Sequence, residues 1–234
     1  RTLTYQGVSS ELVRIPDGTY RLKDEGLFLR VEDQGVSGWE VTDTSGTRYR
    51  FGTTAAAQVV SATGQVFRWA LEEVEDRHGN TLTISYTKDQ GQLYPATIRY
   101  TGHTSLSPPP ANEVTFTLES RPDIETSYRA GFPVTTALRL KTVETKATVA
   151  GSLALARRYD LAYTLSPTTG RSLLASVTQL GTDGSTGLPP VTFTYETGGA
   201  GSYSLLSNVG PPPSQPAWNV RTANADLGHE NHGC

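Results

Sequence analysis

The sequence predicts an all-β fold of antiparallel hairpins with little helix, and three observations support this. Apolar residues alternate with hydroxyl residues in several runs, which is the period-two pattern of a strand with one covered face. The clearest runs are residues 81–87, 114–118 and 191–195. The 234-residue chain contains 23 Gly and 14 Pro, too many turn residues for a helical bundle. Charged residues make up only 18% of the chain, which is low for a helical globular protein.

Longer strands are predicted for residues 66–74, 138–148, 153–163 and 173–180, while residues 54–60 alone suggest a helical turn. Two turns have Asp first and Gly fourth, Asp43 to Gly46 and Asp76 to Gly79, a pattern typical of type I turns. Each lies between apolar or aromatic runs and therefore predicts a hairpin. Asp17-Gly18 and Asp183-Gly184 mark further tight turns.

The two Asp turns belong to a weak internal repeat. Trp39 precedes the first turn and Trp69 precedes the second, and aromatic residues follow each. This spacing suits one hairpin-plus-loop unit stacked on the next. Two unrelated hairpins with common turn residues are the alternative.

Composition also bounds the domain organisation and excludes some functions. The formal net charge of −3 leaves no basic face for nucleic acid, and no apolar run is long enough for a transmembrane helix. We predict a β-hairpin domain in residues 1–197, a Gly/Pro-rich linker in 198–216 and the start of a further repeat or domain in 217–234. Residues 107–110 form a shorter Pro-rich spacer. Because the chain contains no Met and begins in a strand-like run, we expect it to be a segment of a longer protein.

Several motifs together resemble a known family. Trp69-Ala70-Leu71, followed by Asp76-Arg77-His78-Gly79-Asn80 and Tyr86, is similar to the Trp…Asp-x-x-Gly-Asn…Tyr pattern of Rhs/YD-repeat proteins. The wider order resembles the amino-terminal region of SpvB-like virulence proteins and of the B component of insecticidal toxin complexes (Tc toxins). Further matching motifs, in chain order, are Asp17-Gly18-Thr19-Tyr20-Arg21, Trp39-Glu40-Val41, Ser127-Tyr128-Arg129-Ala130-Gly131-Phe132, Tyr159-Asp160-Leu161-Ala162-Tyr163 and Gly170-Arg171-Ser172-Leu173-Leu174.

The resemblance implies architecture more than chemistry. In these families β-hairpins form a curved sheet that is part of a large shell, and the shell encloses a toxic C-terminal polypeptide. Residues 224–228 look like the start of a propeller repeat of the B component. The closing Asp-Gly is missing there, so we expect no Ca²⁺ site.

Acidic residues at the end of one predicted strand are the main candidates for acid–base chemistry. Glu73 and Glu75, flanked by Glu72 and Asp76, would share a strand face if the strand is unbroken, as a glycosidase pair requires. A charge run usually faces water, and Asp76 is already explained by its turn. We therefore interpret the run as a solvated strand end.

The other candidates also favour structural roles. We place His78 at a turn tip and His103 before a loop, and we interpret Arg129 as a partner for a loop carbonyl or carboxylate. Ser127 and Ser172 lack a Gly-x-Ser-x-Gly setting for a nucleophile. A spacing that Zn²⁺ could use is formed by His229, His232 and Cys234. The aromatic residues Trp39, Trp69 and Tyr86 suit core packing better than sugar stacking. We predict no catalytic residue, no cofactor and no metal site.

The leading hypothesis is a non-catalytic structural segment of a secreted or cell-surface bacterial Rhs/Tc-type toxin. The alternatives are a cell-surface adhesion or carbohydrate-binding β module, which requires exposed aromatic residues, and a β-sandwich glycoside hydrolase, which requires the carboxylate pair. The expected partners are other parts of the same toxin chain or toxin-complex subunits. Thr-rich, weakly charged strands also predict self-association through open β edges.

Overall fold

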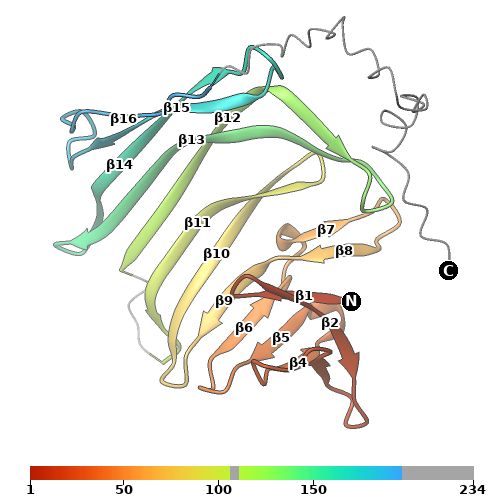
Figure 1. Ribbon diagram of the computed structural model, residues 1–234. Coiled ribbons are helices and arrows are strands. Elements are labelled where there is room, and N and C mark those ends of the chain that lie inside the picture. Colours follow the sequence, from red (N-terminus) through yellow and green to blue (C-terminus); the bar gives the residue numbers. More distant parts are fainter. Residues whose placement is uncertain (106–110, 197–234) are drawn as a thin grey trace, which may run out of the picture. The chain divides into compact units, whose positions relative to one another are not determined.

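The computed structural model describes residues 1–105 and 111–196 and confirms the all-β fold (Figure 1). Fourteen strands form one antiparallel sheet in the order β1-β2-β3-β4-β5-β6-β9-β10-β11-β12-β13-β14-β15-β16, and β7 pairs with β8 in a separate hairpin. Sheet order therefore follows chain order, with the β7–β8 hairpin inserted between two neighbouring strands. The sheet does not close, so β1 and β16 are its edge strands.

The strands before the Asp76 turn are short. They are β1 (Thr2–Tyr5), β2 (Val8–Arg14), β3 (Tyr20–Leu22), β4 (Arg30–Asp33), β5 (Trp39–Thr42), β6 (Arg48–Phe51), β7 (Gln58–Val60), β8 (Val66–Trp69) and β9 (Leu71–Glu75). Two short 3₁₀ helices, η1 (Gly35–Ser37) and η2 (Ala55–Ala57), are the helices of the described residues. The helical turn expected in residues 54–60 is thus one 3₁₀ turn followed by a strand. Neither helix is long and apolar enough to cross a membrane.

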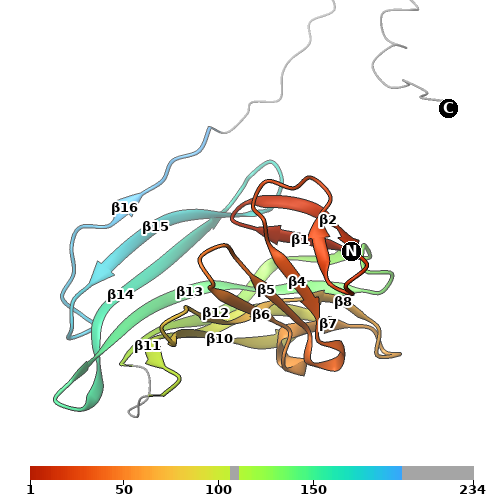
Figure 2. The same ribbon diagram turned by 90° about the horizontal axis from the view of Figure 1, so that it is seen from below.

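Most of the later strands are long and match the predicted runs. They are β10 (Asn80–Asp89), β11 (Gln92–His103), β12 (Asn112–Ser127), β13 (Val134–Val149), β14 (Ser152–Leu165), β15 (Ser172–Leu180) and β16 (Val191–Thr192). Figure 2 shows that this part of the sheet is curved. The last strand is shorter than the predicted run of residues 191–195.

The single strand predicted for residues 66–74 is wrong. The strand is interrupted at Ala70, which separates β8 of the hairpin from β9 of the large sheet. The Ala70 N–H donates to the Ala57 carbonyl at 2.8 Å, and the Ala70 carbonyl accepts from the Gly52 N–H at 2.8 Å. The backbone of Ala70 therefore bonds to two different segments where the chain passes from the hairpin to the large sheet. The unbroken apolar pattern could not indicate this change of partner.

Both predicted Asp turns are confirmed. The Asp43 carboxylate accepts the backbone N–H of Ser45 at 2.9 Å, and that of Asp76 accepts the N–H of His78 at 2.8 Å. Gly46 and Gly79 have φ of 85° and 86°, a left-handed conformation that favours glycine. The two hairpins, β5–β6 and β9–β10, are neighbours because β6 pairs with β9.

The main apolar core lies under the first strands. Its buried residues are Tyr5, Leu22, Leu29, Val31, Trp39 and Val41. Neighbouring half-buried residues, among them Phe51 and Trp69, pack against it. The β7–β8 hairpin thus contributes to this core through Trp69, although it belongs to another sheet. The Pro-rich spacer at residues 107–110, the linker at 198–216 and the predicted start of a domain at 217–234 lie outside the described residues.

Candidate functional site

The carboxylates at the end of β9 are ion-paired, so the expected solvated strand end is wrong. Glu73 and Glu75 do share one strand face, but Arg50 of the neighbouring β6 contacts both. Its Nη2 lies 2.9 Å from Oε2 of Glu75, and its Nε lies 3.0 Å from Oε2 of Glu40. Arg48 adds a second contact, 2.7 Å from Oε1 of Glu75. The carboxylates are therefore held in place by arginines of the neighbouring strand.

Glu72 also has a structural role. Its carboxylate accepts the Thr53 hydroxyl at 2.7 Å and the Thr54 backbone N–H at 2.8 Å. Thr54 immediately precedes η2, so the carboxylate fixes the entry to that 3₁₀ turn. The fourth acidic residue, Asp76, serves its own turn as predicted.

Among the described residues, His78 and His103 form local hydrogen bonds, and neither bonds to Ser127 or Ser172. Nε2 of His78 accepts from Nε of Arg77 at 3.1 Å, and Nδ1 of His103 accepts the Ser105 N–H at 3.0 Å. Within residues 1–105 and 111–196 no group of His, Cys, Asp or Glu is arranged to hold a metal ion. His229, His232 and Cys234, like residues 224–228, lie outside the described residues.

Arg129 does not have the structural partner that we expected. Its side chain is exposed and makes no hydrogen bond or ion pair with the residues that the structure describes; only its backbone N–H bonds, to Ser127 Oγ at 3.4 Å.

Trp39 and Trp69 pack as predicted. Their ring centroids are 5.9 Å apart with an interplanar angle of 76°, an edge-to-face contact. Trp39 is only 7% exposed, and the Tyr86 hydroxyl donates to the Leu71 carbonyl at 2.6 Å. These rings therefore do not form an exposed platform for sugars.

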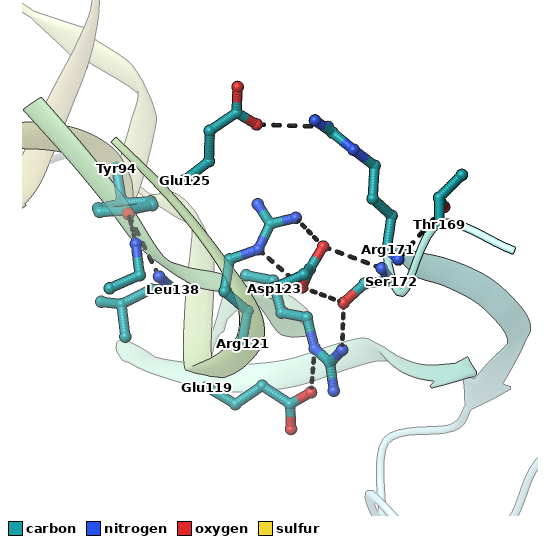
Figure 3. Close-up of polar contacts among 11 residues, drawn as sticks. Tyr94, Glu119, Arg121, Asp123, Glu125, Leu138, Thr169, Arg171 and Ser172 are labelled. Carbon is teal, nitrogen blue, oxygen red and sulfur yellow. Dashed lines mark hydrogen bonds and ion pairs between the residues drawn. The ribbon is translucent and has the colours of Figure 1, made fainter. Parts of the chain in front are cut away.

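A polar network that the sequence did not reveal ties β12 to the start of β15 (Figure 3). Asp123 lies in the irregular stretch of β12 between Ser120 and Glu125. Its carboxylate accepts the backbone N–H of Ser172 at 2.9 Å and also its hydroxyl, and it pairs with Arg121. Arg139 of β13 donates to the same hydroxyl at 2.8 Å. Hydrogen bonds from Arg121 and Ser172 hold the pKa of Asp123 well below its usual value.

The network links strands that are not neighbours in the sheet, since β13 and β14 separate β12 from β15. Arg139 also pairs with Glu119 at 2.8 Å, and its guanidinium lies 4.3 Å from the Tyr163 ring centroid. Every charged group in this contact set is paired. The network therefore supports the curvature of the sheet and has no free group for chemistry.

One cavity of the described residues is lined by β1, β8 and several core strands. It measures about 470 Å³, within the usual range for ligand pockets. The core strands supply an apolar floor made of Leu12, Val31, Trp39, Val41 and Phe51. Residues 1–4 and residues 66–69, including Arg1 and Arg68, complete the lining. The lining is thus mostly apolar, and it contains two arginine residues but no carboxylate.

The comparisons with known proteins agree with this architecture. Residues 18–105 match the family described as Salmonella virulence plasmid 65kDa B protein, SpvB. This part of the chain is SpvB-like. The resemblance predicted from the motifs is therefore confirmed. No curated protein sequence matches the chain.

Solved structures share the fold at low sequence identity. The N-terminal domain of the effector SpvB from Salmonella typhimurium strain LT2 is 17% identical with a TM-score of 0.61, over 74% of this chain and 70% of that one. The structure of TcdB2-TccC3-TEV is 18% identical with a TM-score of 0.62, over 83% of this chain. That of TcdB2-TccC3-Cdc42 is 17% identical with a TM-score of 0.62, over the same share of this chain. The match spans only 12% of either TcdB2-TccC3 chain.

Sequence reasoning missed Arg48 and Arg50 although a signal was present. These arginines alternate with Tyr49 and Phe51 beside one turn, as Glu73 and Glu75 alternate with Val74 beside the next. Opposite charges at period two on adjacent hairpins predict cross-strand pairs. The network around Asp123 left no comparable signal, since Ser172 lies 49 residues away.

Proposed function

We propose that this chain is a non-catalytic structural segment of a secreted bacterial Rhs/Tc-type toxin, contributing to the β-shell that encloses a toxic C-terminal polypeptide. The observation that carries the proposal is the unclosed sheet of fourteen strands whose order follows the chain. A sheet of this kind can be extended strand by strand at an open edge, as a shell requires. The similarity to SpvB and to TcdB2-TccC3 structures supports the same conclusion.

The side chains support a role without catalysis. The paired arginines and carboxylates around Arg50 and around Asp123 stabilise strand contacts, and neither set leaves a free acid or nucleophile. In this proposal residues 1–197 are the shell segment, residues 198–216 link it onward, and residues 217–234 begin the next repeat or domain. Its partners are other parts of the same toxin chain or toxin-complex subunits, outside the cell or on its surface.

Limited proteolysis of the complete natural protein tests the shell role. The toxic C-terminal polypeptide should resist protease in the wild type and become sensitive in Asp123→Ala, which cuts the link from β12 to β15. Arg30→Ala is the matched control, because it removes only an exposed pair with Glu32. Equal digestion of that polypeptide in wild type and both variants, with the Asp123 variant shown to be destabilised, would contradict enclosure by this sheet.

The adhesion alternative has less support. It requires an exposed aromatic platform, whereas Trp39 is buried and packs against Trp69. Binding on a glycan array that disappears in Trp69→Ala without unfolding would restore it.

A further inference from the structure

The residues that line the pocket beside β1 indicate a groove between the edges of two strands. A strand that presents only one face to a cavity contributes alternate residues, because successive side chains point to opposite faces. Here β1 contributes Thr2, Leu3 and Thr4 in succession, after Arg1, and β8 contributes residues 66–69 in succession. Consecutive lining indicates that the backbone edges of both strands border the cavity.

The outer edge of β1 carries unpaired backbone groups. β1 pairs only with β2 among the described residues, and the Leu12 N–H donates to the Arg1 carbonyl at 2.8 Å. Bonded and non-bonded residue pairs alternate in an antiparallel ladder, so Leu3 bonds to β2 whereas Thr2 and Thr4 do not. The N–H and C=O groups of Thr2 and Thr4 therefore point away from β2, along the open edge.

The chemistry around this edge selects its ligand. The floor includes Leu12 and Phe51, which are half-buried and offer only apolar contact. Arg1 is neutralised by Asp33, with its Nη1 2.7 Å from Oδ2. Arg68 also lines the cavity; it donates to the neutral Gln92 amide oxygen at 3.0 Å and has no carboxylate partner among the described residues. A negative charge is therefore favoured next to Arg68.

We infer that the groove between β1 and β8 binds an extended peptide segment of another polypeptide by strand addition to β1. The peptide's backbone pairs with the outward groups of Thr2 and Thr4, its alternate apolar side chains enter the floor, and an acidic residue contacts Arg68. A stretch of about four residues matches the length of β1, since a strand rises roughly 3.3 Å per residue. A free edge strand requires backbone partners, which a small amphipathic molecule does not supply. This inference goes beyond the shell role and does not depend on it.

Fluorescence anisotropy with the full 234-residue chain tests the inference. The probe is a labelled peptide of sequence Asp-Val-Thr-Val-Thr-Val-Asp. Thr4→Pro removes an outward N–H and keeps the backbone bonds to β2, while it also removes the hydrogen bond between the Thr4 and Ser9 hydroxyls at 2.8 Å. Proline is tolerated on edge strands. Thr4→Pro and Arg68→Glu should each weaken binding about tenfold or more, which corresponds to ~1.4 kcal/mol. A peptide with Lys in place of Asp should bind more weakly to the wild type.

Thr192→Pro is the matched control. Thr192 lies on β16, the opposite edge strand, and the Phe193 N–H donates to the Ala175 carbonyl, so the Thr192 N–H also points outward. This variant should bind the peptide like the wild type, and circular dichroism should show that all variants are folded.

Three results would overturn the inference. Unchanged affinity in folded Thr4→Pro would exclude pairing with β1. Equal binding of a backbone N-methylated peptide would indicate an apolar pocket that does not read the backbone. A concentration-dependent dimer abolished by Thr4→Pro would show that a second copy of this chain occupies the edge.

Discussion

Replacing Gly79 by Val should destabilise the sheet more than the same change at Gly46. The two glycines occupy the fourth position of equivalent Asp turns, with φ of 86° and 85°. An L-residue in this conformation costs about 1–2 kcal/mol. This backbone cost should be equal at both sites, which makes Gly46→Val the control for the surroundings.

The surroundings differ at the two sites. A Cβ at Gly79 would lie 2.6 Å from Oγ1 of Thr104 and 3.2 Å from Cε1 of His103. At Gly46 it would meet only Cβ of Arg77, at an ordinary 3.7 Å. Relief of these contacts requires the Thr104 and His103 side chains to move, beside the bond from the Thr104 N–H to the Gly79 carbonyl at 2.9 Å, and a lost hydrogen bond costs roughly 1 kcal/mol.

We therefore expect a loss of about 2–3 kcal/mol for Gly79→Val and about 1–2 kcal/mol for Gly46→Val. For a domain of this size the Gly79 variant should melt roughly 4–12 °C below the wild type. Urea unfolding followed by Trp fluorescence, and thermal unfolding by circular dichroism, measure both variants. An unchanged midpoint for Gly79→Val would refute the left-handed turn. Equal losses at both sites would refute the contribution of Thr104 and His103.

Three further predictions concern the ion pairs and the open edge. Arg50→Met should cost about 2–3 kcal/mol in urea unfolding because Glu75 is buried, whereas Arg30→Met, at an exposed pair, should cost less than about 1 kcal/mol. The lowered pKa of Asp123 means that its ionised form stabilises the fold above about pH 4 and that this contribution is lost as pH falls further. Asp123→Asn should therefore have a lower urea midpoint than the wild type at pH 7, and the gap should narrow at pH 3. The wild type should self-associate at micromolar concentration in light scattering, and Thr192→Pro should reduce this; a wild type that is monomeric at all concentrations would show that the β16 edge is covered.

The sequence could predict the features that depend on neighbours in the chain. Asp76 and Gly79 specify their turn because the carboxylate bonds two residues ahead and the glycine takes a positive φ. Alternating apolar residues located β10, β13, β14 and β15 for the same reason, since each strand repeats its own pattern. No strand was predicted where β11 lies.

Features that depend on distant residues could not be predicted in this way. The break at Ala70 comes from backbone bonds to Gly52 and Ala57, and no residue type at the break signals it. Asp123 directly follows a proline, which in a sequence favours a loop over a strand. The partner of its carboxylate, Ser172, lies far along the chain on β15. The groove beside β1 also depends on this interruption at Ala70, because the β7–β8 hairpin that lines the groove lies outside the large sheet.

The two open edges of the sheet differ in chemistry and therefore suit different partners. Around β16, Val191, Phe193 and Tyr195 are exposed by 42% to 62%, and no charged residue lies between Leu188 and Tyr195. Such an edge accepts any strand that covers its apolar side chains. The β1 edge instead borders a groove lined by Arg68, which has no carboxylate partner among the described residues and should therefore favour acidic peptides. In the proposed shell segment the β16 edge therefore suits further strands of the same sheet, whereas the β1 edge suits the acidic peptide inferred above.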